Sequence, residues 1–285
     1  MNVSVVIILY NPTASDLENV SRFSRAYPGV VVDNSSVPSF PEATMGLMTY
    51  LCLHRNMGIA AAQNAALRLL LASPQTEYIV FLDQDTRASD HYPTDIANEF
   101  LEAEASIPEG TAGLSLIGPT VIHKETGEAY KSVIHKDRMV NPHLILKRHI
   151  ISSGSCAHRS AFDDVGLFEE GLFIDFVDDE WCWRANKKGY VCGITPLLTI
   201  NHKIGQREVH IGKHIVTISA PKRYYYQYRN YLLLLRRNYV PRQWKMAYGV
   251  KFAARFCYFP ILIKGGFKCW KYMLRGIWAA MKAKK

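Results

Sequence analysis

The chain has 285 residues, of which 48% are hydrophobic and 21% are charged, so it can bury a full core and is not an intrinsically disordered protein. The net charge of +9 is uneven, because residues 209–285 contain 17 Lys and Arg and no acidic residue, whereas residues 1–208 contain 17 basic and 25 acidic residues. The two parts therefore have different electrostatic roles, and we predict a domain at 1–220 and a basic helical region at 221–285.

The acidic part alternates between strand and helix patterns. The strands are short apolar runs ended by turn residues, and the helices show apolar residues three apart or are rich in Ala and Leu. In chain order, we predict strands at 3–11, 29–36 and 78–85 and helices at 14–26 and 56–73. Strands joined by helical crossovers form parallel sheets, so the predicted fold class is α/β, with a mostly parallel central sheet and flanking helices.

Polar side chains follow each predicted strand at its carboxyl end, where ligands gather in open parallel sheets. They are Tyr10, Asn11, Asp33, Asp83 and Asp85. The sequence has no GxGxxG and no GxxxxGK[ST], which argues against a Rossmann dinucleotide site and a P-loop. Asp83 and Asp85 lie one residue apart after an apolar run, and because burying like charges unpaired is costly, we expect a cation beside them.

The order of these and later motifs resembles the family-2 glycosyltransferases with the GT-A fold. Within that family the chain is most similar to the bacterial L-rhamnosyltransferases, which build cell-surface polysaccharides from dTDP-L-rhamnose. The resemblance spans residues 3–237 and rests on the order of the motifs, since a single DxD triplet occurs by chance in many chains. The segments that carry it are VVIILYN, VVDNSS, RNMGIAAAQNAAL, FLDQDT, SSGSCAHRSAFDDVGLFEEGLFIDFVDDEWCWRANKKGY, INHKIG and YYYQYRNYLLLLRR.

The resemblance implies a divalent metal, Mg²⁺ or Mn²⁺, at the DxD triplet. A nucleotide-sugar donor carries a pyrophosphate, and a hard cation stabilises the charge that builds up as the diphosphate leaves. Asp85 would bind the metal, and Asp83 would contact the sugar or nucleoside of the donor. His202 corresponds to a residue that completes the metal site in several relatives, although a lone His is more often structural. The alternative for the two aspartates is a solvated turn.

The nucleotide would lie at the ends of the first strands. Asp33 resembles the family residue that accepts the N3–H of a pyrimidine base, although an Asx-type turn also fits the DNSS sequence. Asn56 and Gly58 match the family's Asn-x-Gly ahead of a helix, near the nucleoside, and the alternative for Asn56 is a helix N-cap. Tyr10 and Asn11 are assigned to the same site because they follow the first strand.

An inverting transfer needs a general base that takes the proton of the attacking acceptor hydroxyl. In the resembled family this base is an Asp just before a helix that starts with an acidic residue, an aromatic residue, Cys and Arg. Aligned residue by residue, Asp178 falls on the base. Many relatives have Glu before the base where this chain has Val177, so Asp179 remains the alternative. Neighbouring acids raise one another's pKa values, which suits a base, but acids also favour a helix start.

The acceptor side is assigned by the same resemblance to the loop at 152–155 and to the acidic segment around the base. A plain turn explains the SSGS loop nearly as well. The residues assigned to acceptor and sugar binding are Gly154, Asp175, Asp179, Glu180 and Trp181.

The basic region at 221–285 contains 16 of the chain's 33 aromatic residues. Basic residues interleaved with aromatics suit an anionic membrane or a nucleic acid, and no run reaches the ~18 apolar residues that a spanning helix needs. On a helix over 264–285, six large apolar residues fall within roughly a 100° arc beside lysines, which is typical of an interfacial helix. They are Phe267, Trp270, Leu274, Ile277, Trp278 and Met281. The alternative is a core-packing helix with a basic edge.

These features predict a metal-dependent, inverting rhamnosyltransferase that uses dTDP-L-rhamnose and a lipid-linked glycan acceptor. We expect it on the cytoplasmic side of the inner membrane, bound peripherally, because the start of the chain lacks a signal-peptide pattern and the six cysteines are scattered. One alternative is a transferase of the same fold that uses a UDP-sugar. The other is a non-enzymatic nucleic-acid or lipid-binding module, but the acids at 175–180 argue against nucleic acid as a partner.

Overall fold

The computed structural model describes residues 1–40, 45–107, 109–123, 138–202, 207–211 and 214–283. At residues 123, 201–202, 207–211 and 214–217 it describes the backbone alone. The contacts divide the chain into two compact units: unit 1 comprises residues 1–173 and 177–202, and unit 2 comprises residues 174–176 and 203–285. The boundary predicted at Pro221 falls within unit 2, at the first residue of helix α6 (Pro221–Leu235).

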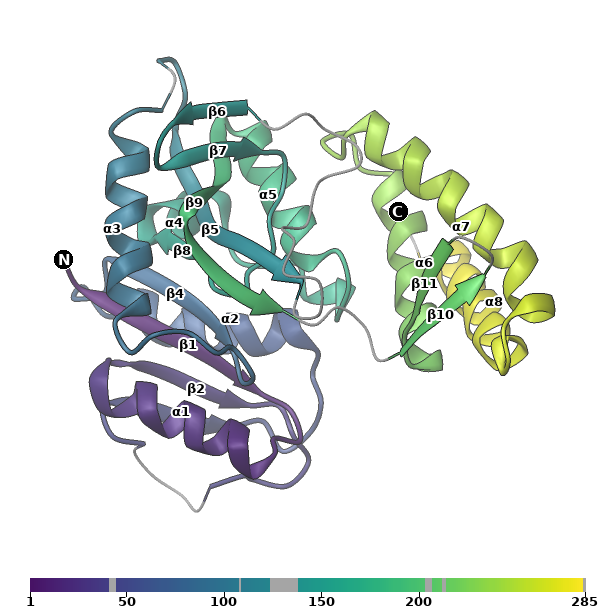
Figure 1. Cartoon of the computed structure of the whole chain (residues 1–285), viewed down its shortest axis with the longest axis horizontal. Helices are drawn as coiled ribbons and strands as arrows, with labels where there is room; N and C mark the ends of the chain where they lie inside the picture. The colour runs from purple at the N-terminus through teal and green to yellow at the C-terminus, as the bar shows by residue number, and fades with distance from the viewer. Residues whose placement is uncertain (41–44, 108, 124–137, 203–206, 212–213, 284–285) are drawn as a thin grey trace. The chain divides into compact units, whose positions relative to one another are not determined.

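Within the described ranges, unit 1 is built on a nine-stranded sheet with the strand order β3-β2-β1-β4-β8-β5-β9-β7-β6 (Figure 1). β1 to β4 are parallel to one another, as are β5 and β9, while β8 and β7 run antiparallel to their neighbours. The strands are β1 (Val3–Leu9), β2 (Gly29–Asp33), β3 (Met48–Cys52), β4 (Tyr78–Asp83), β5 (Gly113–His123), β6 (Arg138–Asn141), β7 (Leu144–Lys147), β8 (Cys156–His158) and β9 (Tyr190–His202).

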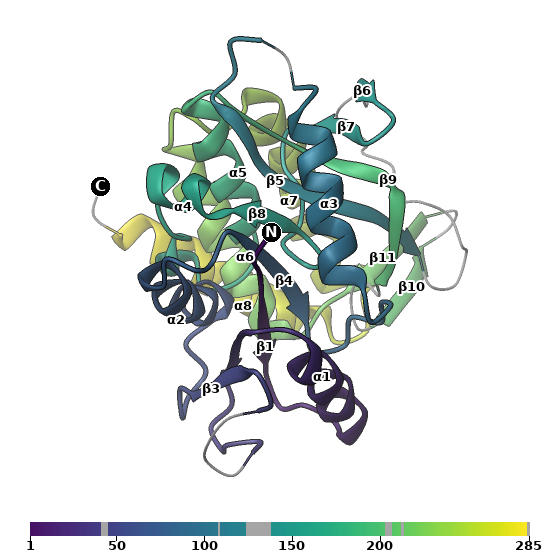
Figure 2. The same cartoon turned by 90° about the vertical axis from the view of Figure 1, so that its left-hand side faces the viewer.

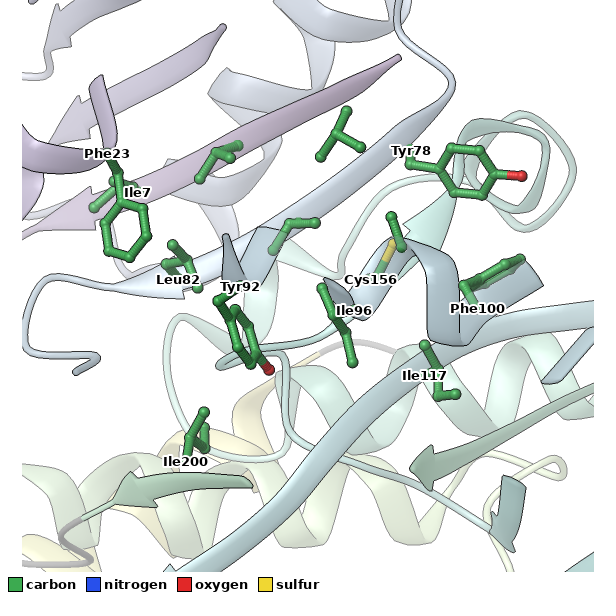
Figure 3. Packing of buried hydrophobic residues seen from close by; sticks show 14 of the residues in the cluster. Ile7, Phe23, Tyr78, Leu82, Tyr92, Ile96, Phe100, Ile117, Cys156 and Ile200 are labelled. Atoms are coloured by element: carbon green, nitrogen blue, oxygen red, sulfur yellow. The ribbon is translucent and has the colours of Figure 1, made fainter. Parts of the chain in front are cut away.

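Helices cover both faces of this sheet (Figure 2). On one face, Ile7 and Leu82 pack with Phe23 of α1 and Ile96 of α3, as Figure 3 shows. On the other, the Phe81 ring contacts two aromatic rings of the segment after β8. The helices are α1 (Ala14–Ala26), α2 (Ile59–Ala72), α3 (Tyr92–Glu104), α4 (Arg159–Val165), the 3₁₀ turn η1 (Glu170–Leu172) and α5 (Val177–Lys187).

The predicted α/β fold class, with its mostly parallel sheet, is confirmed. The five predicted elements are all present, with the strands ending two or three residues earlier than the patterns suggested. β3 was not predicted: it is a short strand at the sheet edge, and four of its five residues are at least partly exposed. The early strand ends matter, since they leave the polar residues in the loops that follow.

Unit 2 contains a hairpin of β10 (Arg207–Ile211) and β11 (His214–Ile218), followed by α6, α7 (Arg242–Leu262) and α8 (Gly266–Lys282). Its buried side chains are largely aromatic: the Phe252 ring stacks on Tyr228, and the Trp244 ring stacks on Tyr248. None of the helices in the described part of the chain has the length and apolar content to cross a membrane.

Candidate active site

The polar residues predicted at the strand ends lie along one edge of the sheet. Asp33 ends β2 opposite Leu9 of β1, and Asp83 ends β4 opposite Ile8 of β1. The two carboxylates therefore flank the end of the central strand of this parallel group. Tyr10 and Asn11 follow that strand directly, and both are exposed.

The backbone after β1 is held by its neighbours on both sides. The Tyr10 amide donates to Gln84 Oε1 at 2.7 Å, and the Asn11 amide donates to Ser35 Oγ at 2.8 Å. Asn11 takes a left-handed conformation with φ of 46°, which Asn tolerates better than most residues. The Tyr10 side chain is 50% exposed, so a flat aromatic surface stands open at the edge where ligands gather.

The DxD turn is fixed by hydrogen bonds that leave one carboxylate open. The Asp83 amide donates to Thr86 Oγ1 at 2.9 Å, and Asn19 of α1 donates to the Gln84 carbonyl at 3.1 Å. Asp83 is half-buried, whereas Asp85 is exposed. Among the described residues, no hydrogen bond or ion pair engages the Asp85 carboxylate. A rigid turn thus presents a hard oxygen ligand to solvent.

Asp33 is fully buried and already hydrogen-bonded. Its carboxylate accepts from the amides of Ser35 at 2.9 Å and Ser39 at 2.7 Å, and from the Tyr50 hydroxyl at 2.7 Å. Burial by itself would raise the pKa of Asp33, but the hydrogen bonds outweigh it and the pKa is lowered. The Asx-type turn is therefore present, and contact with a pyrimidine base stays a prediction that would use a remaining lone pair.

The loop before α2 is tied to the end of β2 by two asparagines. Asn56 Oδ1 accepts from the Gly58 amide at 2.9 Å and from Asn34 Nδ2 at 3.2 Å, while Asn34 Oδ1 accepts from the Met57 amide at 2.7 Å. The N-cap interpretation of Asn56 is wrong, because Gly58 occupies the cap position. Gly58 has φ of 86°, and a Cβ there would lie 2.5 Å from the Phe173 carbonyl oxygen.

Asp178 lies in the first turn of α5, close enough to the DxD turn for the charge of Asp83 to affect its pKa. Burial, followed by the charges of Asp179 and Asp83, raises its pKa from 3.8 to about 7, against hydrogen bonds from Ser152 that lower it. The proximity of Asp83 places the end of β4 and the start of α5 in one site. A carboxyl group whose pKa lies near the working pH is well suited to act as a general base.

The SSGS loop borders this site, because its Ser152 hydrogen-bonds to Asp178. The Gly154 amide donates to the Phe81 carbonyl at 2.8 Å, and the Tyr92 hydroxyl donates to the Gly154 carbonyl at 2.6 Å. Gly154 has φ of 74°, and a Cβ there would meet Tyr92 Oη at 2.9 Å. Gln63 of α2 donates to Ser152 Oγ at 2.9 Å, so the residue that contacts Asp178 is itself held in place.

The acids around Asp178 have separate surroundings. Asp179 Oδ1 lies 3.8 Å from His149 Nε2, and Asp175 pairs with Arg223 at 2.9 Å within unit 2. Glu180 is 1% exposed and pairs with Arg184, one turn along α5, at 2.9 Å. Trp181 is fully buried and donates to the Gly166 carbonyl at 2.7 Å. The side chains of Glu180 and Trp181 thus serve to pack α5, and we leave them out of the proposed binding surface.

Asp175 belongs to a left-handed turn just before α5. Phe173, Asp175 and Phe176 have φ of 66°, 66° and 65°. Side chains of this size rarely adopt such values, and each such residue costs of order 1–3 kcal/mol. Asn230 Nδ2 holds the turn by donating to the carbonyls of Ile174 at 2.7 Å and Asp175 at 3.1 Å.

His202, the other predicted metal ligand, ends β9, but its side chain lies outside the described residues. In the part of the chain that is described, no group of three or more His, Cys, Asp or Glu side chains is placed to hold a metal. A hard cation such as Mg²⁺ takes one or two carboxylates when substrate phosphates complete its shell, and Asp85 fits that need.

Sequence reasoning missed the residues that support the site. His149 and Asn19 reach it across long stretches of sequence, and no local pattern marks them. Gln84 lies inside the predicted DxD triplet, but neither it nor Asn34 was given a role. The signal that could have found Asn34 is its place directly after a strand whose end was already assigned.

Comparison with known proteins gives two sequence relatives, and no protein-family model matches the chain. It is 34% identical over 256 residues to the dTDP-rhamnosyl transferase RfbF of Shigella flexneri, covering 84% of this chain and 82% of that protein. It is 24% identical over 206 residues to the low-salt glycan biosynthesis hexosyltransferase Agl10 of Haloferax volcanii, covering 67% of this chain and 64% of that protein.

Solved structures share the fold. S. aureus TarS 1–349 in complex with UDP-GlcNAc aligns with a TM-score of 0.56 and 15% identity over 96% of this chain and 80% of that chain. GalNAc-T7 with UDP, GalNAc and Mn²⁺ aligns with a TM-score of 0.51 and 14% identity over 71% of this chain and 44% of that chain. At these identities the likeness concerns the fold alone.

Proposed function

The chain belongs to the family-2 glycosyltransferases with the GT-A fold, and on that premise we propose that it transfers L-rhamnose from dTDP-L-rhamnose to a hydroxyl group of a lipid-linked glycan. The observation that carries the chemistry is the raised pKa of Asp178 beside Asp83, at the edge where the strands end. The donor sugar is proposed from the Shigella relative, which covers most of both chains.

The reaction needs a base on one side of the anomeric carbon and a leaving diphosphate on the other. Asp178 takes the proton of the acceptor hydroxyl, whose oxygen forms the new glycosidic bond as the bond to the diphosphate breaks, so the configuration inverts. Ser152, held by Gln63, donates to the Asp178 carboxylate and orients it toward the acceptor. Asp179 is the alternative base, but its carboxyl lies within reach of His149.

The donor would lie across the strand ends. Asp83 at β4 would contact the sugar or nucleoside, while Asp33, Asn56 and Gly58 shape the nucleoside side and the exposed Tyr10 ring offers a stacking surface for the base. Asp85 would hold a divalent cation, Mg²⁺ or Mn²⁺. We add His202 to its ligands by analogy with relatives. Such a cation would neutralise charge on the departing diphosphate.

We further propose that the basic region at 221–285 associates with an anionic membrane, where a lipid-linked acceptor would reside, on its cytoplasmic side. Residues 209–285 contain no acidic residue, and α8 exposes Phe267, Trp278 and Met281. Lys282 Nζ lies 3.6 Å from the centre of the Trp278 ring, a pairing suited to a headgroup layer.

A panel of nucleotide sugars tests the donor. Nucleoside diphosphate release should be fastest with dTDP-L-rhamnose plus Mg²⁺ or Mn²⁺, and NMR of the product should show an inverted anomeric configuration. Faster release from a UDP-sugar would select the alternative donor, and a retained configuration would exclude direct displacement aided by a single base. Absence of turnover together with tight oligonucleotide binding would favour a non-enzymatic module.

A further inference from the structure

Helix α8 meets the rest of unit 2 through small residues and one methionine. Its buried residues are Gly266, Cys269, Met273, Gly276 and Ala280. A Cβ on Gly276 would lie 2.3 Å from the Tyr225 carbonyl oxygen of α6, so the two helices approach backbone to backbone. Several large apolar residues of α8 are turned outward instead of filling the core: Phe267 is 54% exposed and Trp278 is 56% exposed.

Helix α7 has a second apolar face, which sequence patterning did not reveal. Its inner face is aromatic and buries Trp244, Phe252 and Phe259. Its outer face is also apolar, with residues spaced by three and four that fall within roughly a 100° arc of the helix. These exposed residues, the α7 stripe, are Met246, Val250, Ala253, Ala254, Cys257 and Ile261.

The α7 stripe contains no charged or hydrogen-bonding side chain and leads into the turn before α8. There Ile261 is 80% exposed and Leu262 is 58% exposed, beside the exposed Lys264 and Lys268. Scattered exposed apolar residues are ordinary, but a continuous stripe marks an interaction site.

We propose that the α7 stripe and the turn at 261–267 insert into the interface of an anionic bilayer. This deepens the membrane association proposed above and does not depend on the identity of the donor. The charge of this region favours an anionic lipid surface over a second copy of the chain as the partner. Two such surfaces, each in a region of 17 basic and no acidic residues, would repel each other. Exposed lysines beside the apolar turn would meet anionic headgroups.

The test compares full-length variants in binding to phosphatidylcholine vesicles with and without phosphatidylglycerol. Val250→Gln with Ile261→Gln removes apolar contact without changing charge, and we expect at least about tenfold weaker binding to the anionic vesicles. The bound variant should also be released by salt, while wild type is released only partly, since salt screens charge and not apolar contact. The matched control is Leu69→Gln with Met139→Gln, which changes two exposed apolar residues of unit 1.

A second measurement reads insertion directly. Cys257 is exposed in the stripe, whereas the other cysteines are buried or half-buried, so a fluorophore can be attached there. Brominated anionic lipids should quench it. Unquenched fluorescence together with wild-type binding of the Val250→Gln, Ile261→Gln variant would overturn the proposal. So would a dimer, detected by sedimentation, that this variant dissociates in the absence of vesicle binding. Donor hydrolysis by the variant should equal that of wild type, which separates this result from failure of the proposed catalysis.

Discussion

At the scale of single residues, the catalytic proposal depends on the ionisation of Asp178. Its pKa of about 7 means that about half of the protein has a proton on the base at neutral pH. We expect kcat/KM to rise about tenfold per pH unit below 7 and to level off above it, because only the ionised form accepts a proton.

Removal of the base should abolish this pH dependence. Asp178→Asn should lower kcat by at least ~10²-fold, while donor affinity stays close to that of wild type. The measurement is a pH series of initial rates, with Asp179→Asn as the matched variant. An inactive Asp179→Asn beside an active Asp178→Asn would move the base by one residue.

Ionisation of Asp178 raises activity but lowers the stability of the folded protein. The pKa of Asp178 is higher in the folded protein than its ordinary 3.8, so the folded state binds the proton more tightly than the unfolded chain. The free energy of unfolding is therefore reduced as pH rises from about 4 through 7. Asp178→Asn should raise Tm at pH 8, by about 2–4 °C for each kcal/mol that the buried charge costs, and the gain should shrink toward pH 4. A constant difference across this range would remove Asp178 as its cause.

Asp85 gives a separate test of the metal. Because its carboxylate is exposed and makes no hydrogen bond or ion pair with a described residue, Asp85→Ala should leave Tm unchanged, within about 0.5 kcal/mol of wild-type stability. It should abolish the Mg²⁺- or Mn²⁺-dependent part of donor binding, measured by calorimetry with dTDP. Full activity of the variant, or of wild type in excess EDTA, would contradict a metal at this position.

The residues of the site that could be predicted are those whose position follows from strand order. Asp33 and Asp83 end the two strands that flank β1 in the parallel part of the sheet, and that register follows from the β-branched runs before them. The contact of His149 with Asp179 could not be predicted, because it depends on how a loop and a helix approach in space. The burial of Glu180 also escaped sequence reasoning, since an acid in a helix first turn is ordinarily exposed.

At the scale of elements, the start of α2 depends on one glycine. Gly58→Ala combines a positive φ with a Cβ 2.5 Å from the Phe173 carbonyl oxygen, so we expect a loss of at least about 2 kcal/mol in stability and a weakened nucleotide site. Gly110→Ala is the matched control, because Gly110 has φ of 82° but no atom within 4 Å of its added Cβ. Equal effects on Tm in thermal melts would assign the cost to backbone conformation alone.

For helix α7, secondary structure was easier to predict than which face is buried and which is exposed. The hydrophobic period of an amphipathic helix arises from one apolar and one polar face. α7 has an aromatic inner face and an aliphatic outer face, so the period is lost, and Lys251 and Arg255 interrupt the apolar residues of its sequence. Helix α8 had a clear period, but its packed face consists of Met273 and four small residues instead of its Phe and Trp side chains.

At the scale of the whole molecule, α8 cannot be treated as a detachable anchor. Deleting residues 264–285 would remove the helix that packs on the α6 backbone at Tyr225. We expect this truncation to weaken binding to anionic vesicles and also to lower Tm or increase proteolysis of unit 2. Trp278→Gln with Met281→Gln should weaken vesicle binding without changing Tm, because both side chains are exposed. Retention of wild-type vesicle binding by both variants would exclude α8 from the membrane surface.

The left-handed turn at 173–176 affects the order in which parts of the chain can fold during synthesis. Ile174 and Asp175 leave the ribosome well before Asn230 and Arg223, the residues that hold their carbonyls and carboxylate. A nascent chain that has completed β1 to β4 can already form the nucleotide edge, yet the segment leading into Asp178 has none of these α6 partners. We therefore expect this turn, and the start of α5 that follows it, to be fixed only once α6 has emerged and folded.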